Sequence, residues 1–188
     1  MSGAESDLIY LQAGIKILEA YLLSQELYWS IQVNPPAGEP PFPSLTLGGI
    51  LLAQARLSAR FLPNHLQAKR DKLELELDTF RTHWRVAWEK KASREYHARL
   101  NLWRDFLEEY RASPESQADR FKYEVSRRVM LELLLPYSTV TAPAEKEMLV
   151  GLDQVLHAVF LPGDFIWDQD FAPGFPPRPY WYLYGRLR

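Results

Sequence analysis

Residues 64 to 112 contain neither glycine nor proline and form an uninterrupted run of roughly fifty residues. A typical helix in a globular protein has about 11 to 12 residues, so the run predicts one very long helix or two nearly continuous ones. The expected boundary residues are present. Pro63 ends the preceding segment and Asn64 is a good N-cap, while Ser113 and Pro114 close the run and open the next helix.

Apolar side chains recur every three or four residues along this run and predict one buried stripe. They are Leu73, Leu77, Phe80, Trp84, Trp88, Ala92, Tyr96, Leu100, Trp103, Leu107 and Tyr110. Their mean spacing of about 3.7 residues exceeds the 3.6 of a straight helix, so the stripe drifts around the axis. We favour a continuous rod, about 70 Å long at 1.5 Å per residue. The alternative is a bend or tight turn near Ser93, within the polar patch from Glu89 to Arg94.

Four shorter segments with helical spacing accompany this run. They are 7–29, capped by Asp7; 45–61, capped by Ser44; 114–135, opened by Ser113 and Pro114; and 143–161, begun at Thr141 and Pro143 and stopped by Pro162 and Gly163. Gly48 and Gly49 lack the flanking residues of a phosphate-binding motif, so they predict close approach of another helix. We therefore expect an all-α helical bundle of about five helices with one very long central helix, as a single domain of residues 1–188.

Two proline-rich segments are expected to lack long regular elements. Residues 34–43 predict a stiff polyproline-like connection anchored by Phe42; a ligand for an SH3 or WW domain is the alternative. Residues 164–188 mix many aromatic residues with prolines and predict an extended wrap over the bundle, in which 180–184 form a short strand-like or helical piece. Otherwise a partner protein or a second copy of the chain would cover these aromatics.

The composition excludes several classes of function. The chain has no cysteine, which rules out disulfides, thiolate catalysis and cysteine-ligated metal clusters. A net charge of -2 gives no support for binding nucleic acid or membranes through bulk charge. Glu5 and Asp7 stand where a signal peptide would be positive, and no apolar run approaches the length of a membrane span. We expect a cytoplasmic protein without a membrane partner.

Patterns of catalytic and metal-binding residues are weak. The sequence contains no Glu-x-x-His, His-Glu-x-x-His or Gly-x-Ser-x-Gly motif. Two groups at helical spacing offer only partial metal sites, because an open catalytic zinc site needs three protein ligands. They are Asp153 with His157, and Asp78 with Thr82 and His83. Neighbouring carboxylates such as Glu108 and Glu109 suit a solvated helix surface. We predict no catalytic residue, cofactor or metal.

Basic residues are unevenly distributed. Between Arg56 and Arg104 they outnumber acidic residues about two to one, which raises the alternative of a helical subunit of a nucleoprotein complex. Its phosphate contacts would be Arg81, Arg85, Lys90, Lys91 and Arg94. Acidic residues interrupt this series, so a solvated helix surface is the favoured explanation.

The leading hypothesis is a non-enzymatic helical interaction or scaffold subunit that contacts another protein or a second copy of itself. Its anchors would be Trp88, Trp103, Trp181 and Tyr184, because large aromatic side chains dominate interface energetics. A nucleoprotein subunit is the first alternative. A helical-bundle enzyme with an unrecognised site is the second.

Overall fold

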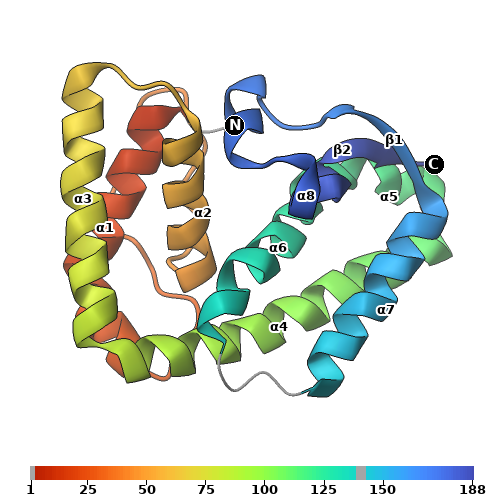
Figure 1. Ribbon diagram of the computed structural model, residues 1–188, viewed down its shortest axis with the longest axis horizontal. Helices are drawn as coiled ribbons and strands as arrows, with labels where there is room; N and C mark the ends of the chain where they lie inside the picture. Colours follow the sequence, from red (N-terminus) through yellow and green to blue (C-terminus); the bar gives the residue numbers. More distant parts are fainter. Residues whose placement is uncertain (1–2, 139–142) are drawn as a thin grey trace.

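Helices form most of the structure, a computed structural model in which residues 3–138 and 143–188 are described (Figure 1). The α-helices are α1 (Ala4–Leu23), α2 (Leu47–Ala59), α3 (Asn64–His83), α4 (Arg85–Ala112), α5 (Pro114–Gln117), α6 (Phe121–Leu134), α7 (Pro143–Val159) and α8 (Pro177–Tyr180). Short 3-10 helices are η1 (Ala118–Arg120), η2 (Leu135–Tyr137), η3 (Gln169–Gly174) and η4 (Trp181–Leu183). Strands β1 (Phe160–Phe165) and β2 (Tyr184–Leu187) pair antiparallel. The predicted all-α bundle with an aromatic C-terminal segment is confirmed.

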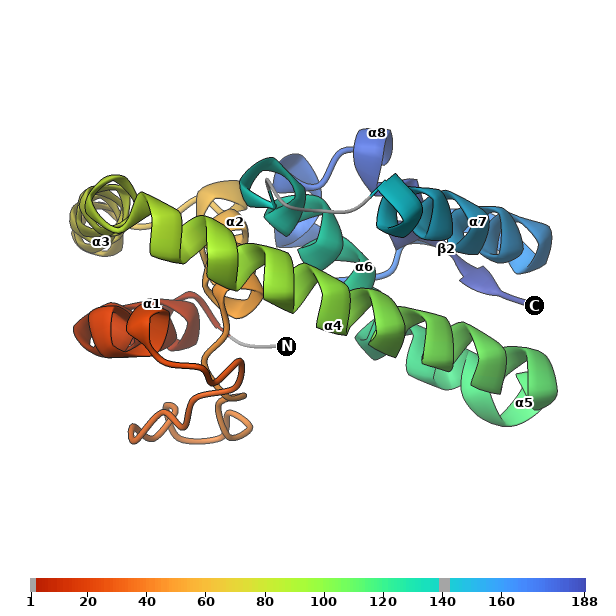
Figure 2. The ribbon, with the colours of Figure 1, turned by 90° about the horizontal axis from the view of Figure 1, so that it is seen from below.

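Helix α4 lies at the centre of the fold and contacts α1, α2, α3, α6 and α7. Helices α1, α2 and α3 stand side by side at its beginning, and α6 and α7 cover its second half (Figures 1 and 2). Its predicted apolar stripe is buried along the whole helix, from Trp88 through Tyr96 and Trp103 to Tyr110. The stripe drifts around the axis of α4 because different helices pack against α4 at different points along its length. The buried apolar residues form one connected cluster.

The predicted continuous helix is wrong, because the run breaks at Trp84. Trp84 has φ -104° and ψ 30°, outside the helical region, and separates α3 from α4. Backbone hydrogen bonds of 2.8 Å, from Trp84 N to Phe80 O and from Trp88 N to Trp84 O, continue across the break. Figure 1 shows α3 and α4 meeting at a corner. The alternative bend near Ser93 is also wrong, since Ser93 lies inside α4.

The corner has a physical reason in the apolar residues of α3. Leu73 and Leu77 are buried because α3 folds back along α1. A straight rod would leave both side chains in water, and burial of each leucine stabilises the fold by about 1.5–3 kcal/mol. No glycine or proline marks the break, which explains why turn chemistry could not locate it.

Both ends of α1 differ from their prediction. The helix begins at Ala4, before the predicted cap Asp7, whose buried carboxylate is paired with Arg56 and Arg60 of the α2 region. It ends at Leu23, well before Trp29. Trp29 instead forms a backbone bridge with Leu45, in which each N–H donates to the other residue's carbonyl oxygen. The segment between α1 and α2 is therefore a loop whose two ends, at Trp29 and Leu45, lie side by side.

Helix α2 is capped by Thr46 rather than by the predicted Ser44. The Thr46 hydroxyl accepts a hydrogen bond of 2.9 Å from Gly49 N. The predicted close approach at the glycine pair is confirmed at Gly48, where an added Cβ would lie 2.6 Å from Glu95 Oε1 of α4 and 3.2 Å from Met130 Cβ of α6. Only glycine lets these three helices meet at this distance.

The two proline-rich segments pack against the helices as expected. Residues 34–43 contain no helix or strand, and Phe42 lies against the core with its ring 5.8 Å from that of Tyr10. In the C-terminal segment Phe171, Phe175 and Tyr182 are fully buried. The predicted helix stop at 162–163 lies instead within β1, because α7 ends at Val159 and the strand follows directly. The predicted start of the last long helix at residue 141 lies outside the described residues.

Candidate functional site

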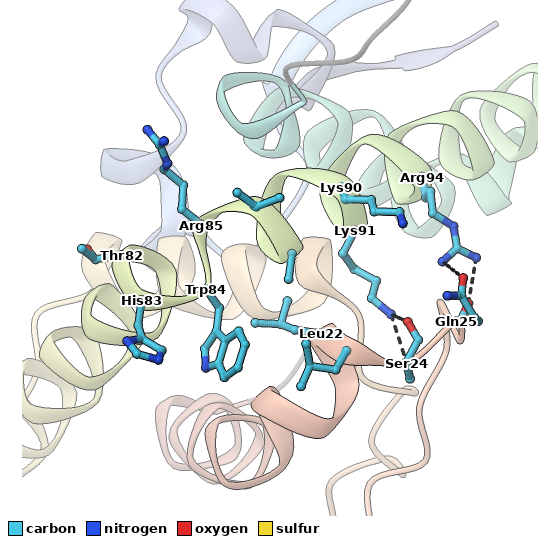
Figure 3. Close-up of a pocket in the computed structure, with 13 residues that line it drawn as sticks. Leu22, Ser24, Gln25, Thr82, His83, Trp84, Arg85, Lys90, Lys91 and Arg94 are labelled. Atoms are coloured by element: carbon cyan, nitrogen blue, oxygen red, sulfur yellow. Dashed lines mark hydrogen bonds between the residues drawn. The ribbon is translucent and has the colours of Figure 1, made fainter.

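A pocket of about 570 Å³ lies where the end of α1 faces the corner between α3 and α4 (Figure 3). Ligand pockets commonly measure roughly 300–1,000 Å³, so the size suits a small molecule or one or two inserted side chains. The lining residues are Leu22, Leu23, Ser24, Gln25, Thr82, His83, Trp84, Arg85, Val86, Ala87, Lys90, Lys91 and Arg94. They come from two stretches of chain that are far apart in the sequence.

The end of α1 is held by cations of α4. The last turn of α1 contains no basic residue to interact with the negative end of the helix dipole. Lys91 Nζ donates to Ser24 O at 2.8 Å and to Glu26 O at 2.7 Å, and the Arg94 guanidinium donates to Gln25 O at 2.7 Å. Figure 3 shows both side chains reaching from α4 to this loop. The positive charges of Lys91 and Arg94 on α4 therefore interact with the negative end of α1, and this contact forms one wall of the pocket.

Lys91 is an unusually buried lysine, with 2% of its surface exposed. Besides its carbonyl contacts, its Nζ lies 4.4 Å from the centre of the Tyr21 ring, a cation–π contact. Burial and then the neighbouring Arg94 cation lower the pKa of Lys91 to about 8, and Glu26 and Glu95 act in the opposite direction. A charge held this way costs stability unless its hydrogen bonds are satisfied.

The other wall of the pocket is apolar and open to solvent. Leu23 is 56% exposed and Val86 is 74% exposed. Trp84 is half-buried and meets His83 edge to face, with 5.1 Å between the ring centres. Exposed large apolar side chains beside a pocket are typical of binding surfaces.

Lys90 is, with Arg85, an exposed cation of this pocket. Among the described residues it has no hydrogen-bond or ion-pair partner, and no carboxylate lines the pocket. The contacts of Lys91 and Arg94 are to neutral oxygens of residues 24 to 26. Three positive charges within one turn of α4 therefore face the pocket without a carboxylate in contact.

The structure brings together four of the five residues predicted for nucleic-acid binding. Arg85, Lys90, Lys91 and Arg94 line the pocket. Arg81 is instead bound to Asp78 and donates to Tyr137 Oη at 2.6 Å. Arg85 is exposed, but its side chain points away from Trp84 in Figure 3. The predicted stripe is thus a set of four pocket residues, with Arg81 outside it.

The predicted interface anchors divide into two pairs. Trp88 and Trp103 are fully buried in the chain's own core, which corrects their prediction as partner contacts. Large aromatic side chains supply core stability as readily as interface energy, and spacing along a helix cannot distinguish the two. Trp181 and Tyr184 are half-buried. Trp181 stacks on His157 at 3.6 Å between ring centres, and Tyr184 Oη donates to Phe175 O at 2.9 Å.

The partial metal sites are used for other contacts. Both carboxylate oxygens of Asp153 accept hydrogen bonds of 2.9 Å from Arg128, and Asp78 accepts from Arg81. In the part of the chain that the structure describes, no three or more His, Asp or Glu side chains are grouped to hold a metal ion. No described helix combines the length and the apolar character needed to cross a bilayer.

Sequence reasoning missed this pocket because residues 22–25 and 82–94, which line it, are far apart in the sequence and meet only in the folded chain. One feature of the sequence could have indicated it. The last turn of α1 has no basic residue, and three cations lie between residues 90 and 94 that could take that place. Comparisons of the chain with protein-family models, with curated proteins and with solved structures found no match.

Proposed function

We propose that this protein is a non-enzymatic interaction subunit that docks another protein through the pocket between α1 and the α3–α4 corner. One observation carries the proposal: exposed apolar side chains, Leu23 and Val86, stand beside a solvent-exposed lysine in a pocket of ligand size. Most aromatic side chains of the C-terminal segment, the alternative docking surface, are packed in the chain's own core.

The polar groups of the pocket support binding better than catalysis. Its two hydroxyl groups are engaged by backbone carbonyls, Ser24 Oγ with Tyr21 O and Thr82 Oγ1 with Asp78 O, each at 2.8 Å. The Ser24 hydroxyl also accepts a hydrogen bond of 3.3 Å from Lys91 Nζ, but this amine acts there as a donor and donates at shorter distance to Ser24 O and Glu26 O. A serine nucleophile would need it as an acceptor of the hydroxyl proton instead. No carboxylate lines the pocket among the described residues, and His83 has only its ring contact with Trp84.

The alternative of a nucleoprotein subunit has weaker support. A nucleic-acid surface needs several cations available to phosphates. Arg81, Lys91 and Arg94 already donate to protein oxygens, which leaves Arg85 and Lys90 as the exposed members of the predicted set. Salt dependence separates the alternatives, because phosphate binding weakens steeply as the salt concentration rises.

Site-specific photocrosslinking in cells of the source organism tests the proposal. A benzophenone amino acid at Val86 should crosslink a discrete protein, while the same group at Val150 of α7, which is 58% exposed, should not. Both positions are exposed on helices, so neither substitution should disturb the core. Equal labelling from both positions, labelling of nucleic acid alone, or none at Val86 would overturn the proposal.

A further inference from the structure

We infer that the occupant of this pocket is an acidic segment of the partner protein, which places one large apolar side chain against Leu23, Trp84 and Val86 and its carboxylates beside Lys90 and Arg94. This inference rests on the proposed function and specifies the chemistry of the partner.

Charge complementarity is the first argument for an acidic segment. Lys90, Lys91 and Arg94 lie within about one helical turn, and the hydrogen bonds that Lys91 and Arg94 make in the described chain are to neutral oxygens. Glu26 contacts Lys91 through its backbone oxygen, and the Glu95 carboxylate is bound to Gly48 N and Arg99. A ligand carboxylate could therefore meet Lys90 without displacing an existing ion pair.

The apolar wall supplies the second argument, because it favours a ligand that carries an apolar side chain in addition to its negative charge. Leu22 is buried and the adjacent Leu23 is exposed, while Trp84 at the corner and Ala87 of α4 are half-buried. An inserted leucine or phenylalanine would remove these surfaces from water, as anchor residues do in protein interfaces. Inorganic phosphate or a simple anion would leave them exposed.

A nucleic acid fits these observations less well. Its backbone carries a charge at each nucleotide and needs a row of cations, whereas the three pocket cations lie in one cluster. Base stacking needs an accessible ring face. Trp84, the aromatic residue nearest these cations in the lining, is half-buried and already contacts His83.

A random library of displayed 12-residue peptides is the probe for this inference. The wild-type full chain should enrich peptides with aspartate or glutamate beside one leucine, phenylalanine or tryptophan. The binding of enriched synthetic peptides is then measured with four variants. Lys90→Glu and Val86→Ser change the pocket, while Lys146→Glu and Val150→Ser make the same changes at exposed positions of α7.

We expect Lys90→Glu and Val86→Ser each to weaken binding of the peptides about five- to tenfold or more, since they reverse a charge contact and remove apolar contact. The α7 controls should stay within about twofold. Enrichment of neutral or basic peptides, no enrichment, or binding that ignores the pocket variants would overturn the inference. A specific crosslink at Val86 combined with any of these results would retain the docking function and reject its acidic chemistry. Tighter binding of single-stranded oligonucleotides, lost in Lys90→Glu, would favour the nucleoprotein alternative over both.

Discussion

Two charged side chains of α4 show how differently one helix can use ion pairs. Glu95 is 1% exposed, and its oxygens accept from Gly48 N at 3.0 and 3.1 Å and from Arg99 Nε at 2.6 Å. It thereby caps the beginning of α2 from another helix, where the helix dipole favours negative charge. Glu108, farther along α4, makes only a surface contact of 3.8 Å with Arg104.

The buried carboxylate should matter far more than the exposed one. Glu95→Ala leaves Arg99 Nε and Gly48 N–H without their acceptor and the buried Arg99 charge without its counter-ion, so we expect the free energy of unfolding to fall by about 3–5 kcal/mol. Glu108→Ala is the matched control and should change it by less than about 1 kcal/mol. Urea denaturation followed by circular dichroism measures both. Similar small losses in the two variants would show that the buried pair does not hold α2 against α4.

Lys91 predicts a particular dependence of stability on pH. Its pKa is lowered from 10.5 to about 8 in the folded protein, so between these values the unfolded chain binds more protons than the folded one. Stability therefore rises with pH across this window through Lys91, by about 1–3 kcal/mol. The measurement is the difference in unfolding free energy between wild type and Lys91→Met at pH 7, 8, 9 and 10.

Subtracting the variant removes the other titrations. Buried Tyr21 and Tyr182 have raised pKa values, so their ionisation in the unfolded chain lowers stability above pH 10 in both proteins. Parallel pH profiles for wild type and Lys91→Met would contradict the assignment of this rise to Lys91.

At the level of helices, the sequence predicted the class of the fold and most of the buried residues, but not the path of the chain. The apolar stripe from Trp88 to Tyr110 was correct because its spacing directly reports one helix face. The break at Trp84 could not be predicted, since it depends on α3 finding cover against α1. Strand β1 was missed because Pro162 and Gly163 resemble a loop, and only the pairing of Pro162 with Gly185 of β2 makes this stretch a strand.

The pocket was unpredictable for the same reason. Its cations were recognised as a group, yet their neighbours at the end of α1 lie more than sixty residues away in the sequence. Spacing along one helix indicates a shared face, but it does not identify what that face meets.

The folded-back position of α3 can be tested with two leucines on the same helix. Leu77 is fully buried and Leu75 is 70% exposed. Leu77→Ala should reduce the free energy of unfolding by about 2–4 kcal/mol, because it opens a cavity between α3 and its neighbours. Leu75→Ala should change it by less than about 0.5 kcal/mol. If α3 continued α4 as a straight rod, Leu77 would face solvent and the two variants would behave alike.

Across the whole molecule, the C-terminal segment joins parts that the helices alone leave apart. Phe171 lies under the Arg60 guanidinium at 4.2 Å, Trp167 Nε1 donates to Lys122 O at 2.9 Å, and Tyr110 Oη donates to Arg188 O at 2.8 Å. These contacts reach the end of α2, the beginning of α6 and the end of α4. The segment is therefore part of the core.

Cooperative unfolding should follow from these long-range contacts. Phe171→Ala removes a fully buried ring and should cost about 3–5 kcal/mol. The midpoints measured by far-ultraviolet circular dichroism and by tryptophan fluorescence should shift together, because helices and aromatic segment share one core. An early fluorescence transition with unchanged helical signal would show instead that the segment detaches independently.

The corner at Trp84 also makes the pocket sensitive to shape. Residues 82 to 84 belong to the end of one arm and 85 to 94 to the start of the other, and both line the same space. A molecule bound in that space contacts both helices, and it therefore opposes a change in the angle between α3 and α4. By the reciprocity of linked equilibria, a force that changes this angle would in turn strengthen or weaken binding of the occupant. The corner at Trp84 thus couples the position of α3 to binding in the pocket.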